Sequence, residues 1–366
     1  MINKASALNT LSLFSGGGGL DLGFAAASFS IVAAMDIDPY SCETLQSNHA
    51  NNGLFHKPIV INKDIYDFSA NNLLVDHKID PKNINVVIGG PPCQAFSVFG
   101  RRGGLKDPRG HLVWEYIRIL KEIDPQVFVF ENVAGIKTIH SGELYSNLMR
   151  ELSCDGVYEV SDHSYDVAEY GIPQHRQRVF FIGIKGQKIP QMNPTHGDNT
   201  GLFPLNPYVT AGVALKGLDE MGKDSKTPNH IGRNHSQRII DRYKSLKFGE
   251  RDHKTRINKL DPCRPSFTII VGSDAGGGKG HVHPYSPREV TPRESARMQT
   301  FPDWWAFSGT GRHVIRQVGN AVPPLFAALL AEHISSHVWK TKRLKSYSDF
   351  LDILKLDYLK DAVYDN

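Results

Sequence analysis

Short apolar runs alternate with amphipathic stretches through the first half of the chain. The runs at residues 8–15, 30–36, 59–64, 84–88, 127–130 and 178–184 are mostly apolar, as the buried strands of a parallel sheet are. Helical patterns fall between them, at residues 20–27, 38–49 and 111–123. Asp38 and Pro39 are typical of a helix start, because an acidic N-cap precedes a proline at the first helical position. The alternation predicts an α/β fold with an open, doubly wound, mostly parallel sheet.

The alternation ends after Lys185, and the composition changes. Residues 187–291 are rich in Gly, Pro, Asn and His and carry only scattered strand signals, such as residues 266–271. Helical patterns return at residues 292–298 and 323–337. We therefore expect three parts: a sheet domain of residues 1–186, a second, smaller domain of residues 187–291, and a hinge with C-terminal helices that return to the sheet, residues 292–366.

The tail of the chain carries an apolar stripe. One helical face would hold Phe350, Leu351, Leu354 and Tyr358. This stripe predicts a helix that docks on the rest of the protein, and a partner-binding helix is the alternative.

Composition narrows the class of protein. Hydrophobic residues make up 40% of the 366 positions and charged residues 22%, which suits a folded core and argues against a chain that is disordered throughout. We find no signal-peptide pattern and no run of roughly 18 uncharged apolar residues, so we expect a cytoplasmic protein. The four cysteines form no Cys-x-x-Cys pair, which argues against a disulfide framework and a zinc site: Cys42, Cys93, Cys154 and Cys263.

The net charge of +4 is unevenly distributed. Between Lys226 and Leu260, ten Lys or Arg residues stand against three acidic residues, so this window carries +7 and the rest of the chain −3. Basic charge gathered in one window favours a polyanion-binding face, with an ordinary solvated surface as the alternative.

A glycine loop, FSGGGGLDLGF, joins the first predicted strand to the first predicted helix at residues 14–24. Glycines let backbone N–H groups approach a ligand at a helix N-terminus. Asp36 ends the next strand, where an acid binds ribose hydroxyls in dinucleotide folds. However, Gly16-x-Gly18 is followed by Asp21 instead of the third fingerprint glycine. The loop therefore favours a nucleoside cofactor over a structural turn, and it is a poor host for pyrophosphate.

A cysteine loop follows another predicted strand. In INVVIGGPPCQAFS, residues 84–97, Cys93 comes directly after two glycines and two prolines. The prolines stiffen the turn, and a rigid turn at the carboxyl end of a sheet presents a thiol well for nucleophilic attack. A lone cysteine is more often a core residue, but the Pro-Pro-Cys turn favours a nucleophile here.

In motif content and order the chain resembles the cytosine carbon-5 DNA methyltransferases over nearly its whole length. Six segments carry the resemblance: residues 14–19, Pro91-Pro92-Cys93-Gln94, Glu131-Asn132-Val133, Gln174-x-Arg176-x-Arg178, Arg293-Glu294-x-x-Arg297-x-Gln299-x-Phe301-Pro302 and Gln317-x-Gly319-Asn320-x-Val322-Pro323. Six motifs in the family's order are far more specific than any one of them.

The resemblance implies methyl transfer from S-adenosylmethionine to carbon 5 of cytosine through a covalent thiol adduct. It makes Cys93 the nucleophile that adds to carbon 6. Glu131 would bind ring N3 and the amino group, and Arg178 the base carbonyl. Arg176 would support the loop or reach a phosphate. Outside the motifs, Glu131 and the arginines would be interpreted as an ordinary surface ion pair.

The resemblance also implies a cofactor site. Phe14 would lie against adenine, Asp36 would bind the ribose, and Asp64 would accept from the adenine amino group, with a helix N-cap as the alternative role of Asp64. The full set of implied cofactor residues is Phe14, Ser15, Gly16, Gly18, Gly19, Leu20, Asp36, Ile37, Asp64, Ile65, Pro91, Asn320 and Val322.

The implied partner is double-stranded DNA, from which the target base must be rotated out. Residues 97–110 have the character of a mobile lid, and a recognition module is expected between Arg178 and Arg293. Residues 265–271 resemble a recognition strand around Thr268, and the glycine cluster at 276–280 is a flexible or DNA-facing loop. The implied DNA contacts are Gln94, Ser97, Arg101, Arg102, Arg109, Lys254, Arg256 and Thr268.

Three other functions compete with this interpretation. A branch of the same family acts on transfer RNA, and the basic module weakly favours DNA over that substrate. A nicotinamide-dependent oxidoreductase is disfavoured by the missing third glycine, and a non-catalytic relative by the intact Cys93, Glu131 and Arg178. The resemblance further implies a monomer of the bacterial cytoplasm, associated with the nucleoid and accompanied by a separate restriction endonuclease.

Overall fold

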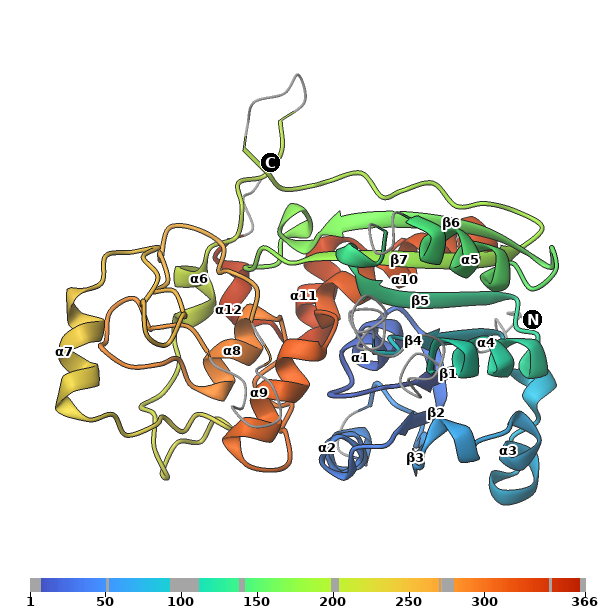
Figure 1. The fold of residues 1–366 in the computed structure, drawn as a ribbon, viewed down its shortest axis with the longest axis horizontal. Helices are drawn as coiled ribbons and strands as arrows, with labels where there is room; N and C mark the ends of the chain where they lie inside the picture. The colour runs from blue at the N-terminus through green and yellow to red at the C-terminus, as the bar shows by residue number, and fades with distance from the viewer. Residues whose placement is uncertain are drawn as a thin grey trace.

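The computed structural model describes residues 8–50, 53–92, 112–137, 142–198, 204–269, 271, 280–341 and 344–362. Its centre is a seven-stranded sheet in the order β3-β2-β1-β4-β5-β7-β6 (Figure 1). The strands are β1 Leu8–Leu13, β2 Phe29–Asp36, β3 Ile59–Asn62, β4 Val86–Gly89, β5 Val127–Val133, β6 Tyr158–Asp166 and β7 Gln177–Lys185. The first five strands in this order pair in parallel, while β7 is antiparallel to both β5 and β6. The predicted doubly wound, mostly parallel sheet is confirmed.

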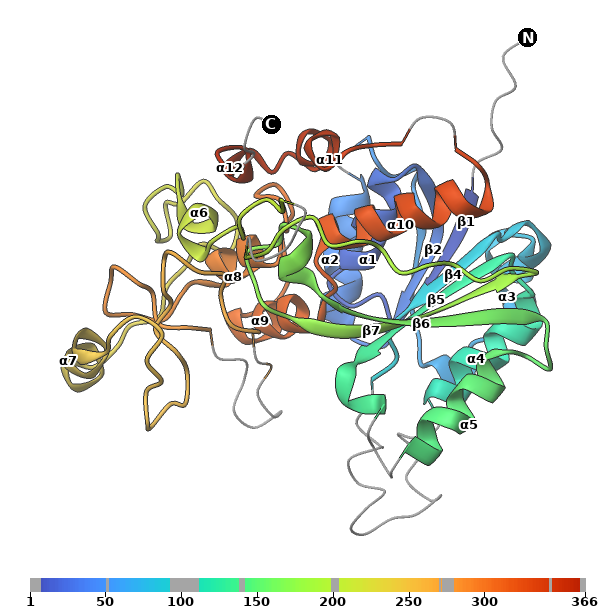
Figure 2. The same cartoon turned by 90° about the horizontal axis from the view of Figure 1, so that it is seen from above.

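Helices cover both faces of the sheet, as Figure 2 shows from above. The helices of this part are α1 Gly19–Ala26, α2 Pro39–Ala50, α3 Ala70–His77, α4 Leu112–Ile123 and α5 Glu143–Leu152. Alternate side chains of β5 enter two separate cores. Val127 and Val129 pack with α1, whereas Phe128 and Phe130 pack with α4 and α5. Two apolar faces explain why the strands are almost continuously hydrophobic.

The C-terminal helices return to the sheet. They are α8 Pro292–Met298, α9 Gly311–Asn320, α10 Pro324–Val338, α11 Tyr347–Leu354 and α12 Asp357–Lys360. A Cβ on Gly23 of α1 would lie 2.4 Å from Ala327 Cβ of α10, so glycine permits this close helix packing. In the tail, Phe350 and Leu354 are fully buried in the same core. Lys355 has a φ of 56°, which divides the predicted tail helix into two.

One stretch of the described residues, Gly311–Val338, is long and apolar enough to cross a membrane, and the sequence analysis did not single it out. In the fold, 83% of its most apolar window is buried. It contains α9 and α10, and α10 packs on α1 and the sheet. The stretch therefore has the burial of core helices.

Residues 187–192 still run along β6 and α10, with Ile189 and Met192 in the core of the sheet. The described residues between 204 and 291 lie to one side of the sheet and carry the short helices α6 Ala211–Leu215 and α7 Gln237–Ser245 (Figure 1). A small apolar cluster holds α7 to the following loops: Tyr243, Leu246, Ile257 and Val282. The strand expected at 266–271 is absent from the described part of that segment. Ser266 makes one isolated bridge to Gln174, because its neighbour is a loop instead of a strand.

Candidate active site

A cavity of about 510 Å³ lies at the carboxyl edge of the sheet, where ligands bind in open α/β folds. Its walls come from the segments that follow β1, β2 and β4, from the end of β5, from the start of β7 and from the turn after α9. The lining residues are Phe14, Ser15, Gly16, Gly19, Leu20, Asp36, Ile37, Gly90, Pro91, Pro92, Glu131, Asn132, Val133, Arg178, Asn320, Ala321 and Val322. Most of the predicted cofactor residues and two predicted catalytic residues thus share one cavity.

The glycine loop, which follows β1, is hydrogen-bonded to Asp36 at the end of the neighbouring strand β2. Gly16 N donates to Asp36 Oδ2 at 2.8 Å, and Asp38 N donates to Oδ1 at 2.8 Å. Burial raises the pKa of Asp36, and these backbone donors oppose that rise. A Cβ at Gly16 would meet no atom within 4 Å, and its φ is +52°. The loop therefore leaves open space above its backbone beside a buried acid.

The C-terminal helices hold the other side of this loop. A Cβ on Gly19 would lie 2.1 Å from Val322 O, so only glycine allows this approach. Trp305 Nε1 donates to Gly17 O at 3.1 Å. Gly18 has a φ of +80° and packs against Leu45 and Trp305. Gly18 therefore supports the loop from outside the cavity lining.

A buried acid lies under the loop, and the sequence analysis gave it no positive role. Asp21 is fully buried, and Ser12 Oγ donates to its Oδ1. Burial raises the pKa of Asp21 to about 7, against the hydrogen bond from Ser12. The Ser12–Asp21 pair joins β1 to α1 directly beneath the glycines.

Asp64 and Ile65 lie outside the cavity lining. Asp64 caps the short helix Ile65–Asp67, since its Oδ1 accepts from Tyr66 N at 3.2 Å. One carboxylate oxygen of Asp64 therefore serves as a helix N-cap, which is the alternative role given above. Ile65 is buried in the core beneath this turn.

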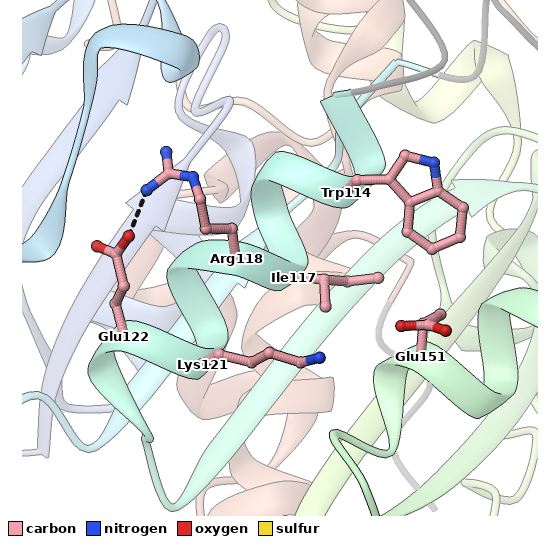
Figure 3. A pocket seen from close by; sticks show the side chains of 6 residues that line it. All are labelled: Trp114, Ile117, Arg118, Lys121, Glu122 and Glu151. Atoms are coloured by element: carbon pink, nitrogen blue, oxygen red, sulfur yellow. Dashed lines mark hydrogen bonds and ion pairs between the residues drawn. The ribbon is translucent and has the colours of Figure 1, made fainter. Parts of the chain in front are cut away.

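Arg118 of α4 fixes the turn that carries Asp64. Its Nη2 donates to Ile65 O at 3.1 Å and to Phe68 O at 2.6 Å. Glu115 and Glu122 pair with the same guanidinium. Arg118 also lines a second cavity of about 410 Å³ with Trp114, Ile117, Lys121, Glu122 and Glu151 (Figure 3). This second cavity shares no residue with the one at the sheet edge.

Glu131 and Arg178 form an ion pair inside the main cavity. Arg178 Nε, from β7, lies 2.9 Å from Glu131 Oε1, near the end of β5. Burial raises the pKa of Glu131, while Arg178 and Arg176 oppose the rise. A Cβ on Gly90 would lie 2.9 Å from Glu131 Oε2. Because position 90 is a glycine, the start of the cysteine loop lies against the Glu131 carboxyl group, whose pKa is raised.

Arg176 is 1% exposed and does not line the cavity. None of the described residues accepts a hydrogen bond from its guanidinium. Burial, reinforced by Arg178, lowers the pKa of Arg176 to about 9, so the group stays charged at neutral pH. Its backbone N–H donates to Asp166 Oδ1 at 3.0 Å.

Several predicted residues lie outside the described residues: Cys93, Gln94, Ser97, Arg101, Arg102, Arg109 and positions 276–279 of the glycine cluster. Pro92, which precedes Cys93 in the chain, lines the cavity. Asn132, which the sequence analysis gave no role beyond its motif, donates from Nδ2 to Pro91 O at 3.2 Å. Asn132 thus ties the start of the cysteine loop to the strand of Glu131.

Three predicted DNA contacts are described and do not line the cavity. Lys254 and Arg256 are exposed on residues 187–291. Thr268 Oγ1 donates to His175 O at 2.7 Å. The structure therefore joins Thr268 to the loop of Arg176 and Arg178, a contact that sequence spacing alone could not indicate.

Comparisons with known proteins show the family of this chain. A family model for the C-5 cytosine-specific DNA methylases matches residues 8–336. The chain is 33% identical to the Type II methyltransferase M.NgoFVII of Neisseria gonorrhoeae, over 88% of this chain and 85% of the relative. It is 34% identical to M1.HphI of Haemophilus parahaemolyticus, over 89% and 86%.

Solved structures show the same fold. A putative DNA modification methyltransferase encoded within an E. coli prophage superposes with a TM-score of 0.73 and 29% identity, over 92% of this chain and 100% of the other. The Dnmt2 methyltransferase of S. pombe is 18% identical with a TM-score of 0.57, over 91% and 100%, which supports the fold alone. The chain belongs to the C-5 cytosine-specific DNA methylase family and is a DNA (cytosine-5-)-methyltransferase.

Proposed function

We propose that this enzyme methylates carbon 5 of a cytosine rotated out of double-stranded DNA, with Cys93 as the covalent nucleophile. The observation that carries the proposal is the single cavity at the sheet edge. That cavity joins the glycine loop and Asp36 to the Glu131–Arg178 pair and to Pro92, which precedes Cys93. A cofactor pocket and a base pocket that meet in one space suit direct group transfer between them.

S-adenosylmethionine, when bound, supplies the methyl group. The residues present fit this cofactor. Gly16 leaves open space over its backbone, Asp36 offers a carboxylate to ribose hydroxyls, and Phe14 offers an aromatic face at the same wall. The acid beside the loop disfavours a pyrophosphate, whose charge it would repel.

The residues of the base pocket compensate for the low nucleophilicity of cytosine carbon 5. Addition of the Cys93 thiolate to carbon 6 makes an enamine, so that carbon 5 becomes nucleophilic. Glu131 holds a proton at ring N3 as negative charge develops there, and Arg178 binds the base carbonyl. Loss of the carbon 5 proton after methyl transfer then expels the thiol. The raised pKa of Glu131 supports its role as a proton-sharing group.

We assign DNA recognition to residues 187–291. Within the basic window, some cations are already paired: Arg242 Nε lies 2.7 Å from buried Asp252, and Arg233 Nη1 lies 3.3 Å from Glu289. Others are exposed: Lys244, Lys247, Arg251, Lys254 and Arg256. Exposed cations of this kind suit phosphate contacts, which position a duplex without reading its sequence.

The biological setting follows from the relatives, which are Type II bacterial methyltransferases. We propose a restriction-modification role with a separate cognate endonuclease, and a monomer that acts on DNA in the bacterial cytoplasm. These relatives do not favour the transfer RNA alternative.

Methyl transfer by a Cys93→Ser variant tests the proposal. We expect no transfer to duplex DNA by Cys93→Ser, while duplex binding stays within about twofold, because the thiol contacts no phosphate. Bisulfite sequencing of DNA methylated by the wild-type enzyme should locate the product at carbon 5 of cytosine. Full activity of Cys93→Ser, or transfer to transfer RNA in preference to duplex DNA, would contradict the proposal.

A further inference from the structure

A short segment within residues 187–291, residues 266–269, lies hydrogen-bonded along residues 173–176, which lead into β7 and end two positions before Arg178. We call residues 173–176 the arginine loop. Ser266 N donates to Pro173 O at 2.9 Å, and His175 N donates to Ser266 O at 2.8 Å. Thr268 Oγ1 adds a third bond, to His175 O. The anchored residues, Pro173 and His175, thus lie within three positions of Arg176 in the chain.

Gln174 adds a side-chain link to this ladder. It is fully buried, and its Oε1 accepts from Ile269 N at 3.2 Å. Its Nε2 lies 3.4 Å from Met298 O, at the end of α8. One amide therefore joins the arginine loop, the segment around Thr268 and a C-terminal helix. A buried amide that loses its partners is costly, so these contacts fix the register of the segment.

The same segment also reaches the cofactor wall. A Cβ on Gly319 would lie 2.6 Å from Val271 Cγ2 and 3.5 Å from Ile269 Cγ2. Gly319 directly precedes Asn320, which lines the cavity. The described residues of this segment, 266–269 and 271, thus contact both the arginine loop and the turn that completes the cofactor pocket.

The segment also has a side chain available to DNA. Phe267 lies between two residues that are bonded to the arginine loop, yet it is 45% exposed. The neighbours of Phe267 in the chain, Ser266 and Thr268, make hydrogen bonds that end on residues 173–175. No described residue accepts from the Arg176 guanidinium, so its placement depends on the backbone around it, which this segment and Asp166 hold.

We propose that Gln174 is a positioning residue that couples sequence recognition to the placement of Arg176 and Arg178. The proposal rests on the function proposed above. A correct target sequence fixes the position of the segment around Thr268. The hydrogen bond between Ile269 and Gln174 then fixes the arginine loop relative to that segment. Without Gln174, the enzyme would still bind its cofactor and DNA but would discriminate less between its target and near-target sites.

The test compares Gln174→Met with Gln299→Met. Both side chains are fully buried amides, but Gln299 Nε2 donates to Val318 O at 2.9 Å and not to the segment around Thr268. The measured quantity is the ratio of single-turnover rates at the target site and at sites that differ by one base pair. Cofactor affinity and Tm are measured on the same samples.

We expect Gln174→Met to lower this ratio at least tenfold while cofactor affinity stays within twofold. Gln299→Met should lower Tm and leave the ratio unchanged. An unchanged ratio in Gln174→Met, or an equal loss in Gln299→Met, would overturn the proposal. A wild-type enzyme without any methyl transfer would instead refute the proposed function.

Thr268→Val provides a second route should Gln174→Met not fold. It removes only the hydroxyl bond to His175 O, at a partly exposed site, and it should reduce the same ratio. In the double variant the two losses should not add, because both contacts act through one register. Additive losses, or a Thr268→Val enzyme with full discrimination, would contradict the shared route.

Discussion

At the scale of single residues, the proposed mechanism depends on the proton affinity of one carboxyl group. Glu131 is buried beside Arg178, and burial raises its pKa against the nearby cations. A protonated carboxyl can share its hydrogen with ring N3, which a carboxylate cannot do. The active form of Glu131 is therefore present below its pKa and is lost as the pH rises through it.

The raised pKa of Glu131 gives a prediction for the pH dependence of the Glu131→Gln variant. In the wild-type enzyme, the single-turnover rate should fall as the pH rises and Glu131 ionises. The variant should be slower by about 10²–10⁴-fold, the usual contribution of a proton-transfer group, and its falling limb should be absent. A variant that keeps the falling limb would show that another group titrates there.

Gly90 tests the same contact by geometry. A Cβ at position 90 would lie 2.9 Å from Glu131 Oε2, whereas a Cβ at Gly135 would meet no atom within 4 Å. Gly90→Ala should therefore lower kcat, and Gly135→Ala should leave kcat unchanged with Tm shifted little. Equal kcat values for both variants would mean that the approach of the loop to Glu131 is unimportant.

At the scale of elements, α4 stabilises the turn that follows β3, although the two are far apart in the sequence. Arg118 donates to the carbonyls of Ile65 and Phe68, next to the predicted adenine contact Asp64. Arg118→Leu should weaken S-adenosylmethionine binding about tenfold, since loss of a charge-assisted bond costs about 1.5 kcal/mol. Lys121→Leu, from the same helix, should bind normally. Calorimetry that finds equal affinity for both variants would contradict this role.

The elements also show what the sequence could and could not reveal. The buried parallel strands and the Asp38 cap were predictable, because apolar runs and capping residues act locally. The strand β6 was not, since this edge strand carries polar residues such as Asp162 and His163. The strand expected at 266–271 is not found among the residues described there, because a β-like sequence forms a strand only when another strand pairs with it.

The candidate site divides in the same way. Gly16 and Asp36 are 20 residues apart, and their contact could be expected because β1 and β2 are neighbours in a parallel sheet. Gln174 and Ile269 are 95 residues apart and belong to irregular segments. No periodicity predicts such a partner, so the link to the arginine loop required the three-dimensional structure.

At the scale of the whole molecule, we propose that DNA affinity and chemistry belong to different regions. Lys254 is exposed and lies outside the lining of the catalytic cavity. Lys254→Ala should weaken binding to all duplexes alike and reduce the slope of log K against log salt by roughly one. Affinity measured over a salt series for target and unrelated duplexes checks this expectation. A change in the methylated sequence would contradict it.

The central claim is covalent catalysis by Cys93, and a trapped adduct tests it most directly. Duplex DNA with 5-fluorocytosine at the target position should capture the enzyme in the presence of S-adenosylmethionine, because fluorine cannot leave as the proton does. Peptide mapping by mass spectrometry should place the adduct on Cys93, and Cys93→Ser should form none. An adduct on Cys42, Cys154 or Cys263, or normal methylation of cytosine without any trapped adduct, would contradict the mechanism.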